Sequence, residues 1–169
     1  PLSLASRNGH KAIVKLLLAR GDVNPNRRRR LGTAPLMWAA RYGYEETAKF
    51  LLVRKDVDPN SPDASGGTPL LWAFVKGHER GVKLLLERED VNLDKPDKSS
   101  YTPLSFAAQN GEKAIVKLLL ARQDVNPDRR GKWLLRPRSL AVISGHTEVV
   151  NLFQFWKTGG PSAVQQAEI

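Results

Sequence analysis

Apolar residues recur along the chain in short blocks that have helical spacing. Ile13, Val14 and Leu16 to Leu18 form one such block, and residues 115–120 repeat it. A shorter apolar stretch comes before a block of this kind, follows a proline and stops at a glycine, as in residues 69–77. Proline suits the first position of a helix, and glycine tolerates the left-handed conformation that ends one. After the second block come an Asp-Val pair and about ten turn-forming residues. The pattern therefore predicts a helix, a turn, a second helix and a loop.

This pattern repeats every 34 residues, and prolines mark its register at Pro1, Pro35, Pro69, Pro103 and Pro137. A glycine follows each of these prolines eight residues later. A fixed period of this length is typical of stacked helical units, because a single helix pair cannot bury both of its apolar faces. We therefore predict an all-α solenoid of about five helix-turn-helix repeats, starting near these prolines and covering residues 1–156.

The two ends of the chain depart from the repeat. The pattern is gone in TGGPSAVQQAEI, so we expect residues 157–169 to form a disordered C-terminal tail. The sequence opens on Pro1 and has its single Met at position 37, so we expect it to be a piece of a longer polypeptide.

The repeat resembles the ankyrin repeat, whose phrase D-x-x-G-x-T-P-L is followed by a glycine-ended first helix and an x-V-x-L-L-L second helix. The third repeat carries most of this phrase, in Asp63, Gly66, Thr68, Pro69, Leu70, Gly77, His78, Val82 and Leu84 to Leu86. The resemblance covers all five repeats and implies an ankyrin-repeat solenoid with β-hairpin-like loops. It also implies a non-catalytic protein–protein interaction module that serves as a scaffold or as the recognition part of a larger protein.

The motif LLLARxDVNPN, with Ser3 and Ser105 where the family usually has His, resembles the repeat sequences of fungal ankyrin arrays in particular. Many of those are attached to NACHT- or NLR-like nucleotide-binding receptors, and the resemblance implies the same attachment here. Ala34 and Arg136 stand where the family has its capping Thr, and Arg138 replaces a Leu in the last repeat. We expect each missing cap to cost its helix about 1 kcal/mol.

Candidate chemistry is sparse. The chain has no cysteine, no stretch long enough to span a bilayer and no signal peptide, so we expect an intracellular, cytoplasmic protein, with a nuclear location as an alternative. His10, His78 and His146 occupy one position of alternate repeats, roughly 20 Å apart, too far to share a metal ion. We predict no cofactor, no metal site and no enzymatic activity. Aromatic residues at one repeat position (Trp38, Trp72 and Phe106) are expected to pack between repeats in the core.

The net charge of +10 is the unusual total, and it is concentrated in two loops. The basic residues of these loops are Arg27, Arg28, Arg29, Arg30, Arg129, Arg130, Lys132, Arg136 and Arg138, and Trp133 lies among the second group. Three interpretations stay open: a solvated charge run, a binding edge for an acidic protein, or a site for nucleic acid or nuclear import.

The leading hypothesis is a monomeric module that binds a protein partner, with an acidic surface as one option, through its concave face and loop tips. Partner-binding candidates come from the basic loops and from the family's variable contact positions: Arg27, Arg28, Arg29, Arg30, Arg41, Lys98, Tyr101, Gln109, Arg129, Arg130, Lys132 and Trp133. The alternatives are a nucleic-acid-binding module that uses the arginine-rich loops, and a structural spacer in a multidomain receptor. No membrane partner is expected.

Overall fold

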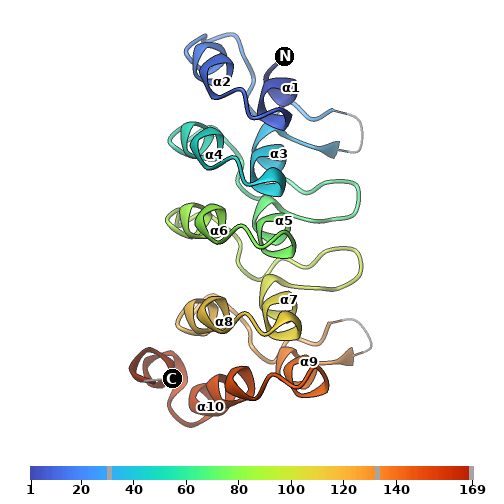
Figure 1. The fold of residues 1–169 in the computed structure, drawn as a ribbon, viewed down its shortest axis with the longest axis vertical. Helices are drawn as coiled ribbons and strands as arrows, with labels where there is room; N and C mark the ends of the chain where they lie inside the picture. Colours follow the sequence, from blue (N-terminus) through green and yellow to red (C-terminus); the bar gives the residue numbers. More distant parts are fainter. Residues whose placement is uncertain (30–31, 132–133, 168–169) are drawn as a thin grey trace. The chain divides into compact units, whose positions relative to one another are not determined.

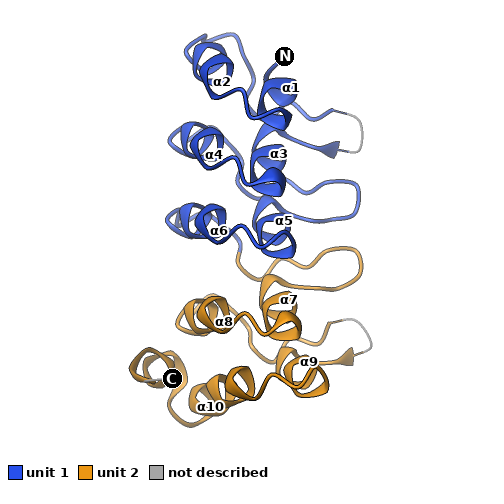
Figure 2. Ribbon diagram, viewed as in Figure 1, with its two compact units in different colours: residues 1–92 blue, residues 93–169 orange. Residues whose placement is uncertain are grey.

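The protein is described here by a computed structural model, which describes residues 1–29, 32–131 and 134–167. These residues form ten α-helices and no β-strand, which confirms the predicted all-α repeat fold. The chain divides into two compact units, residues 1–92 and residues 93–169, which Figure 2 distinguishes by colour.

The first compact unit holds three helix pairs: α1 (Leu2–Arg7) and α2 (Lys11–Leu18), α3 (Pro35–Tyr42) and α4 (Glu45–Leu52), α5 (Pro69–Val75) and α6 (Glu79–Leu86). Helices α1, α3 and α5 stack in one layer, here called the inner layer, while α2, α4 and α6 stack in an outer layer (Figure 1). The loops that follow α2 and α4 project away from the helices as two fingers (Figure 1).

The second compact unit contains α7 (Pro103–Asn110), α8 (Lys113–Leu120), α9 (Pro137–Ile143) and α10 (Thr147–Gln166). Within it, α7 packs against α9 and α8 packs against α10, so the same two-layer arrangement recurs. Helices α3, α5, α7 and α9 all begin at the prolines that marked the repeat in the sequence.

Helix starts follow the capping residues that the sequence supplies. The Thr68 hydroxyl accepts a hydrogen bond from the Leu71 amide at 3.2 Å, and Thr102 forms a capping box with Ser105. Ala34 and Arg136 make no side-chain cap, as the sequence predicted. Because an N-cap side chain satisfies an otherwise unpaired helical amide, α3 and α9 begin less favourably than α5 and α7.

The C-terminal residues differ from the disordered tail that we expected. Helix α10 runs through the predicted boundary at residue 156 and kinks at Gly159 and Gly160, and a further helical segment then continues to Gln166. Val164 in this segment is fully buried, and the Lys117 ammonium donates to the Ala167 carbonyl at 2.6 Å. No helical periodicity is visible in this part of the sequence, because the segment is short and buries few side chains.

The fingers share one tight turn. In each finger, one backbone amide donates to the carbonyl oxygen four residues later, at 2.9–3.1 Å. The donors are the amides of Arg29, Asp63, Asp97 and Gly131. In the two middle fingers, the carboxylate of the first turn residue also accepts amide hydrogen bonds: Asp63 from Ser65 and Gly67, and Asp97 from Ser99 and Tyr101. Arg29 and Gly131 occupy this position in the other two fingers, so these basic fingers lack the carboxylate brace.

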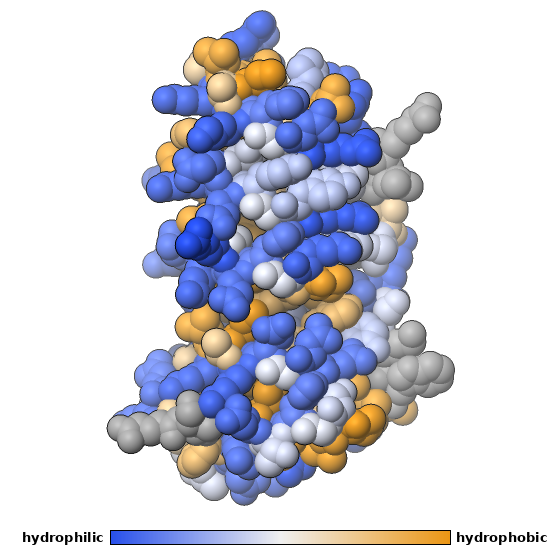
Figure 3. Space-filling view, in the orientation of Figure 1, coloured by the Kyte–Doolittle hydropathy of each residue, from blue (hydrophilic) through white to orange (hydrophobic). Residues whose placement is uncertain are grey.

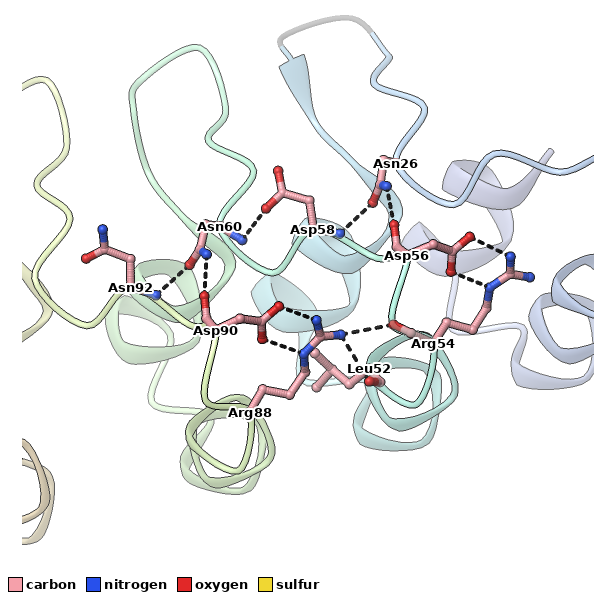
Figure 4. Close-up of polar contacts among 9 residues, drawn as sticks. All are labelled: Asn26, Leu52, Arg54, Asp56, Asp58, Asn60, Arg88, Asp90 and Asn92. Carbon is pink, nitrogen blue, oxygen red and sulfur yellow. Dashed lines mark hydrogen bonds and ion pairs between the residues drawn. The ribbon is translucent and has the colours of Figure 1, made fainter.

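A polar ladder joins successive repeats of the first compact unit (Figure 4). The Asn60 side chain donates to the Asp90 carbonyl at 2.7 Å and accepts from the Asn92 amide at 2.7 Å. One repeat earlier, Asn26 makes the same pair of bonds to Asp56 and Asp58. These bonds fix how far each loop is displaced from the next, and so they fix the spacing of the fingers.

Candidate functional site

The structure places the candidate partner-binding residues in both compact units. The first unit carries Arg27, Arg28 and Arg29 on a finger and Arg41 on α3, whereas the second carries Lys98, Tyr101, Gln109, Arg129 and Arg130. Arg30, Lys132 and Trp133, which the sequence also singled out, lie outside the described residues. Arg41 contacts aromatic rings, whereas several candidates of the second unit contact a carboxylate, a histidine or another ring.

Arg41 lies in a row of alternating cations and aromatic rings on the inner layer of the first unit. Its guanidinium carbon is 4.1 Å from the centre of the Trp72 ring and 6.0 Å from that of Trp38. Arg7 lies 5.1 Å from the Trp38 ring, and the Lys76 ammonium lies 6.0 Å from the Trp72 ring. We call these five residues the stacked row. On the face seen in Figure 3, strongly hydrophilic side chains accordingly interleave with side chains of intermediate hydropathy over α3.

The aromatic column that the sequence predicted to lie in the core is not there, which corrects that prediction. Trp38, Trp72 and Phe106 are only partly buried, whereas Leu36 and Leu70, their neighbours at the helix starts, are fully buried. The side chains of an eight-residue helix point to different sides, and these rings lie on the side that the next helix layer does not cover. The same column of rings is therefore available at the surface.

Neighbouring groups fix the orientation of the two tryptophans. The Trp72 indole N–H donates to the Asp63 carboxylate at 2.8 Å, which ties α5 to the base of its finger. Trp38 stacks on Tyr42 with ring centres 5.8 Å apart and an angle of 6° between the rings. Within the described residues, the Trp38 indole N–H has no hydrogen-bond partner.

The cations of the stacked row differ electrostatically from the arginines of the outer layer. Arg20, Arg54, Arg88 and Arg122 each pair with the aspartate two residues later, at 2.5–3.1 Å. The hydrogen bond from Arg54 lowers the pKa of Asp56 below its ordinary value, and that from Arg88 does the same to the pKa of Asp90. By contrast, no carboxylate in the described part of the chain lies within ion-pair distance of Arg7, Arg41 or Lys76.

The arginine finger of the first unit lies beside a small cavity. Arg27, Arg28 and Arg29 are exposed and line a cavity of about 450 Å³ together with residues 1–3 and 22–24. The Ser3 hydroxyl donates to the Arg27 carbonyl at 3.3 Å, which anchors the base of the finger to α1. These three arginines likewise have no ion-pair partner among the residues that the structure describes.

In the second compact unit the candidate residues are engaged in contacts of their own. Arg129 pairs with Asp94 at 2.6 Å, and the Gln109 carbonyl oxygen is 3.0 Å from a ring nitrogen of His146. Tyr101 packs on Phe106 with ring centres 4.6 Å apart, while Lys98 and Arg130 stay exposed. The candidates of this unit therefore present less uncompensated charge than those of the first.

Two of the three histidines, His78 and His146, each contact the neighbouring repeat. One ring nitrogen of His78 is 3.1 Å from the Arg41 carbonyl oxygen, and the ring covers Gly43 so closely that an added Cβ would approach it within 2.7 Å. His146 covers Gly111 in the same way in the second unit. Because both glycines have a positive φ as well, side chains are doubly disfavoured at these positions. No cluster of three metal-ligating side chains occurs among the described residues.

Sequence reasoning found Arg41 but missed Arg7 and Lys76. A signal was available, because Arg7 and Arg41 stand one 34-residue period apart, as do Trp38 and Trp72. Two interleaved columns with the same period are the sequence signature of a cation–aromatic row on stacked helices.

Comparison with known proteins gives one family match. The model of ankyrin repeats (three copies) matches residues 1–63 and residues 51–131. Among curated proteins, none matches the chain. Over the ranges that the structure describes, no helix is both long and apolar enough to cross a membrane.

Proposed function

Because the chain belongs to the ankyrin-repeat family, whose members are generally non-enzymatic protein–protein interaction modules, we propose that it binds an acidic segment of a protein partner. The binding face is the inner layer of the first compact unit, with the stacked row at its centre and Arg27 to Arg29 at its edge. In the second unit, taken by itself, Tyr101 and Lys98 are the less charged candidate contacts.

The observation that carries this proposal is the set of uncompensated cations held against tryptophan rings. The outer arginines are neutralised by a neighbouring aspartate, whereas Arg7, Arg41 and Lys76 are not. Contact with an aromatic face holds a guanidinium in place and leaves its N–H donors available. A carboxylate that pairs with such a cation gains more than it would from a freely rotating side chain, because less side-chain entropy is lost on binding.

The same features favour a protein over a nucleic acid. Proteins that hold single strands stack bases on open aromatic faces. Here Arg41 already lies 4.1 Å from the Trp72 ring centre, and Tyr42 and Arg7 already contact Trp38. A base would have to displace these groups, whereas a carboxylate can be added to them.

The test is equilibrium binding of a labelled Glu/Asp-rich peptide, its Gln/Asn counterpart, and mixed-sequence DNA and RNA at physiological salt. We expect the acidic peptide alone to bind, and Arg41→Gln to weaken it by up to about fivefold. Arg20→Gln is the matched control, because it removes the same charge from an arginine already paired with Asp22. Tighter binding of nucleic acid than of the acidic peptide would overturn the proposal, as would an equal effect of both variants.

The resemblance to fungal arrays on nucleotide-binding receptors supports a finer proposal, in which this module is the recognition part of a larger protein. The alternative role of a structural spacer predicts that no partner binds the stacked row at all. Sequencing the gene beyond residue 1 tests the attachment. A nucleotide-binding domain encoded there would support this finer proposal, and a gene without such a domain would overturn it.

A further inference from the structure

The ring contacts set an upper limit on the spacing of the stacked row. Arg41 lies 6.0 Å from the Trp38 ring centre and 4.1 Å from the Trp72 ring centre, so the two tryptophans are at most about 10 Å apart. Arg7 and Arg41 lie 5.1 Å and 6.0 Å from the ring centre of Trp38, so these guanidiniums are at most about 11 Å apart. Packed helices are separated by about 8–10 Å, which agrees with one cation on each inner helix.

Few backbone conformations present side chains on one face at this interval. A β-strand does so every second residue, at about 6.8 Å, or every fourth, at about 13.6 Å. Polyproline II has three residues per turn and a rise of about 3.1 Å, so every third side chain returns to the same face after about 9.3 Å. An α-helix with an acidic residue at every seventh position repeats at about 10.5 Å. Because the row has one cation on each inner helix and packed helices are about 8–10 Å apart, polyproline II and the helix match its spacing, whereas the two strand intervals are too short and too long.

The Trp38 indole distinguishes between these two. Its N–H has no partner among the described residues, although the equivalent N–H of Trp72 is bonded to Asp63. A partly buried indole N–H that no protein group accepts is available to donate to an acceptor on a bound partner. Helical carbonyl groups are already bonded within the helix, whereas polyproline II has no internal hydrogen bonds and leaves its carbonyl groups free.

We infer that the partner segment is a polyproline II stretch with an acidic residue at every third position. Its carboxylates pair in turn with Arg7, Arg41 and Lys76, and one of its carbonyl groups accepts the Trp38 N–H. Prolines between the acids hold the segment extended, which lowers the entropy cost of binding. The inference rests on the proposed function, because it specifies the geometry of the acidic segment that this face binds.

The experiment compares labelled 18-residue peptides of equal charge by fluorescence anisotropy with the whole chain. One repeats Asp-Pro-Pro; a second repeats Asp-Pro-Asp-Pro-Pro-Pro, which keeps the composition but shifts every second acid. A third replaces the prolines of the first with Gly and Ser. A fourth is an alanine-based helix with Glu at every seventh position and three more Glu residues on the opposite face, which make its charge equal to that of the others. We expect the first to bind about fivefold more tightly than each of the others, since only the first combines acids at the spacing of the row with a preorganised extended backbone whose carbonyl groups are free.

Variants separate the inference from the proposed function. Arg41→Gln and Trp38→Phe should each remove most of the preference for the first peptide, while Arg20→Gln should keep it. Equal binding of all four peptides that still depends on Arg41 would overturn the polyproline II geometry and leave the acidic-segment function standing. Preference for the helical peptide would likewise overturn the polyproline II geometry and leave the acidic-segment function standing. Absence of Arg41-dependent binding to any of the peptides would overturn both. Unchanged melting temperatures show that each variant is folded.

Discussion

Removing the Asn60 side chain tests whether the polar ladder couples successive repeats. Asn60→Ala deletes the bond to the Asp90 carbonyl and the bond from the Asn92 amide, both at 2.7 Å and both to the following repeat. A hydrogen bond contributes about 0.5–1.5 kcal/mol net. These groups are exposed, so water replaces part of the loss, and we expect the free energy of unfolding to fall by about 1–2 kcal/mol.

The assay is urea unfolding followed by circular dichroism, and Asn24→Ala is the matched control. Among the described residues, the Asn24 side chain accepts just one bond, a local one from the Asn26 amide two residues away, so its loss should cost about 0.5 kcal/mol. A shallower unfolding slope for Asn60→Ala is also expected, because weaker coupling between repeats lets them unfold separately.

Replacement by aspartate sharpens the test, because it keeps the shape of the side chain and removes only the donor. Asn60→Asp places a carboxylate oxygen against the Asp90 carbonyl, so we expect a loss at least as large as that of Asn60→Ala. The reasoning is refuted if Asn60→Ala and Asn24→Ala cost the same, or if Asn60→Asp is harmless.

Four further predictions concern the backbone, a cap, pH and the C-terminal segment. Leu134 is exposed with φ of 59°, so Leu134→Gly should raise the unfolding free energy by about 1 kcal/mol in urea titration; a loss would show that its side chain packs. Ala34→Thr should add about 1 kcal/mol in the same assay by capping α3, and no gain would mean that the hydroxyl cannot reach its amide. The hydrogen bond from Arg88 holds the pKa of Asp90 below its ordinary value of about 3.9. This pair therefore stabilises the fold above that pH, and the stabilisation is lost as the pH falls through the folded-state pKa of Asp90. Arg88→Gln should flatten the decline of the urea midpoint between about pH 5 and pH 2. Val164→Ala should lower the unfolding free energy by about 1–2 kcal/mol because Val164 is fully buried, and an unchanged value would return the segment to the disordered tail that the sequence predicted.

The sequence alone determined the features that depend on neighbouring residues. Pro69 and Thr68 define a helix start within one turn, and the Arg-x-Asp spacing of Arg54 and Asp56 already places opposite charges two residues apart. The 34-residue period extends such local rules along the whole chain and predicts a stack of helix pairs. Periodicity and capping are short-range, and so they can be read without knowing what packs on what.

Only the tertiary structure decided which side of each helix is covered. Trp38 and Trp72 have the period of core residues, yet they lie at the surface beside Arg41, because neither layer of helices covers that side. Whether a cation is compensated depended equally on distant neighbours: Arg129 meets Asp94, 35 residues away, whereas Arg41 meets aromatic rings instead of a carboxylate. Burial and charge pairing are set by groups that are distant in the chain, and a repeat pattern does not specify which groups these are.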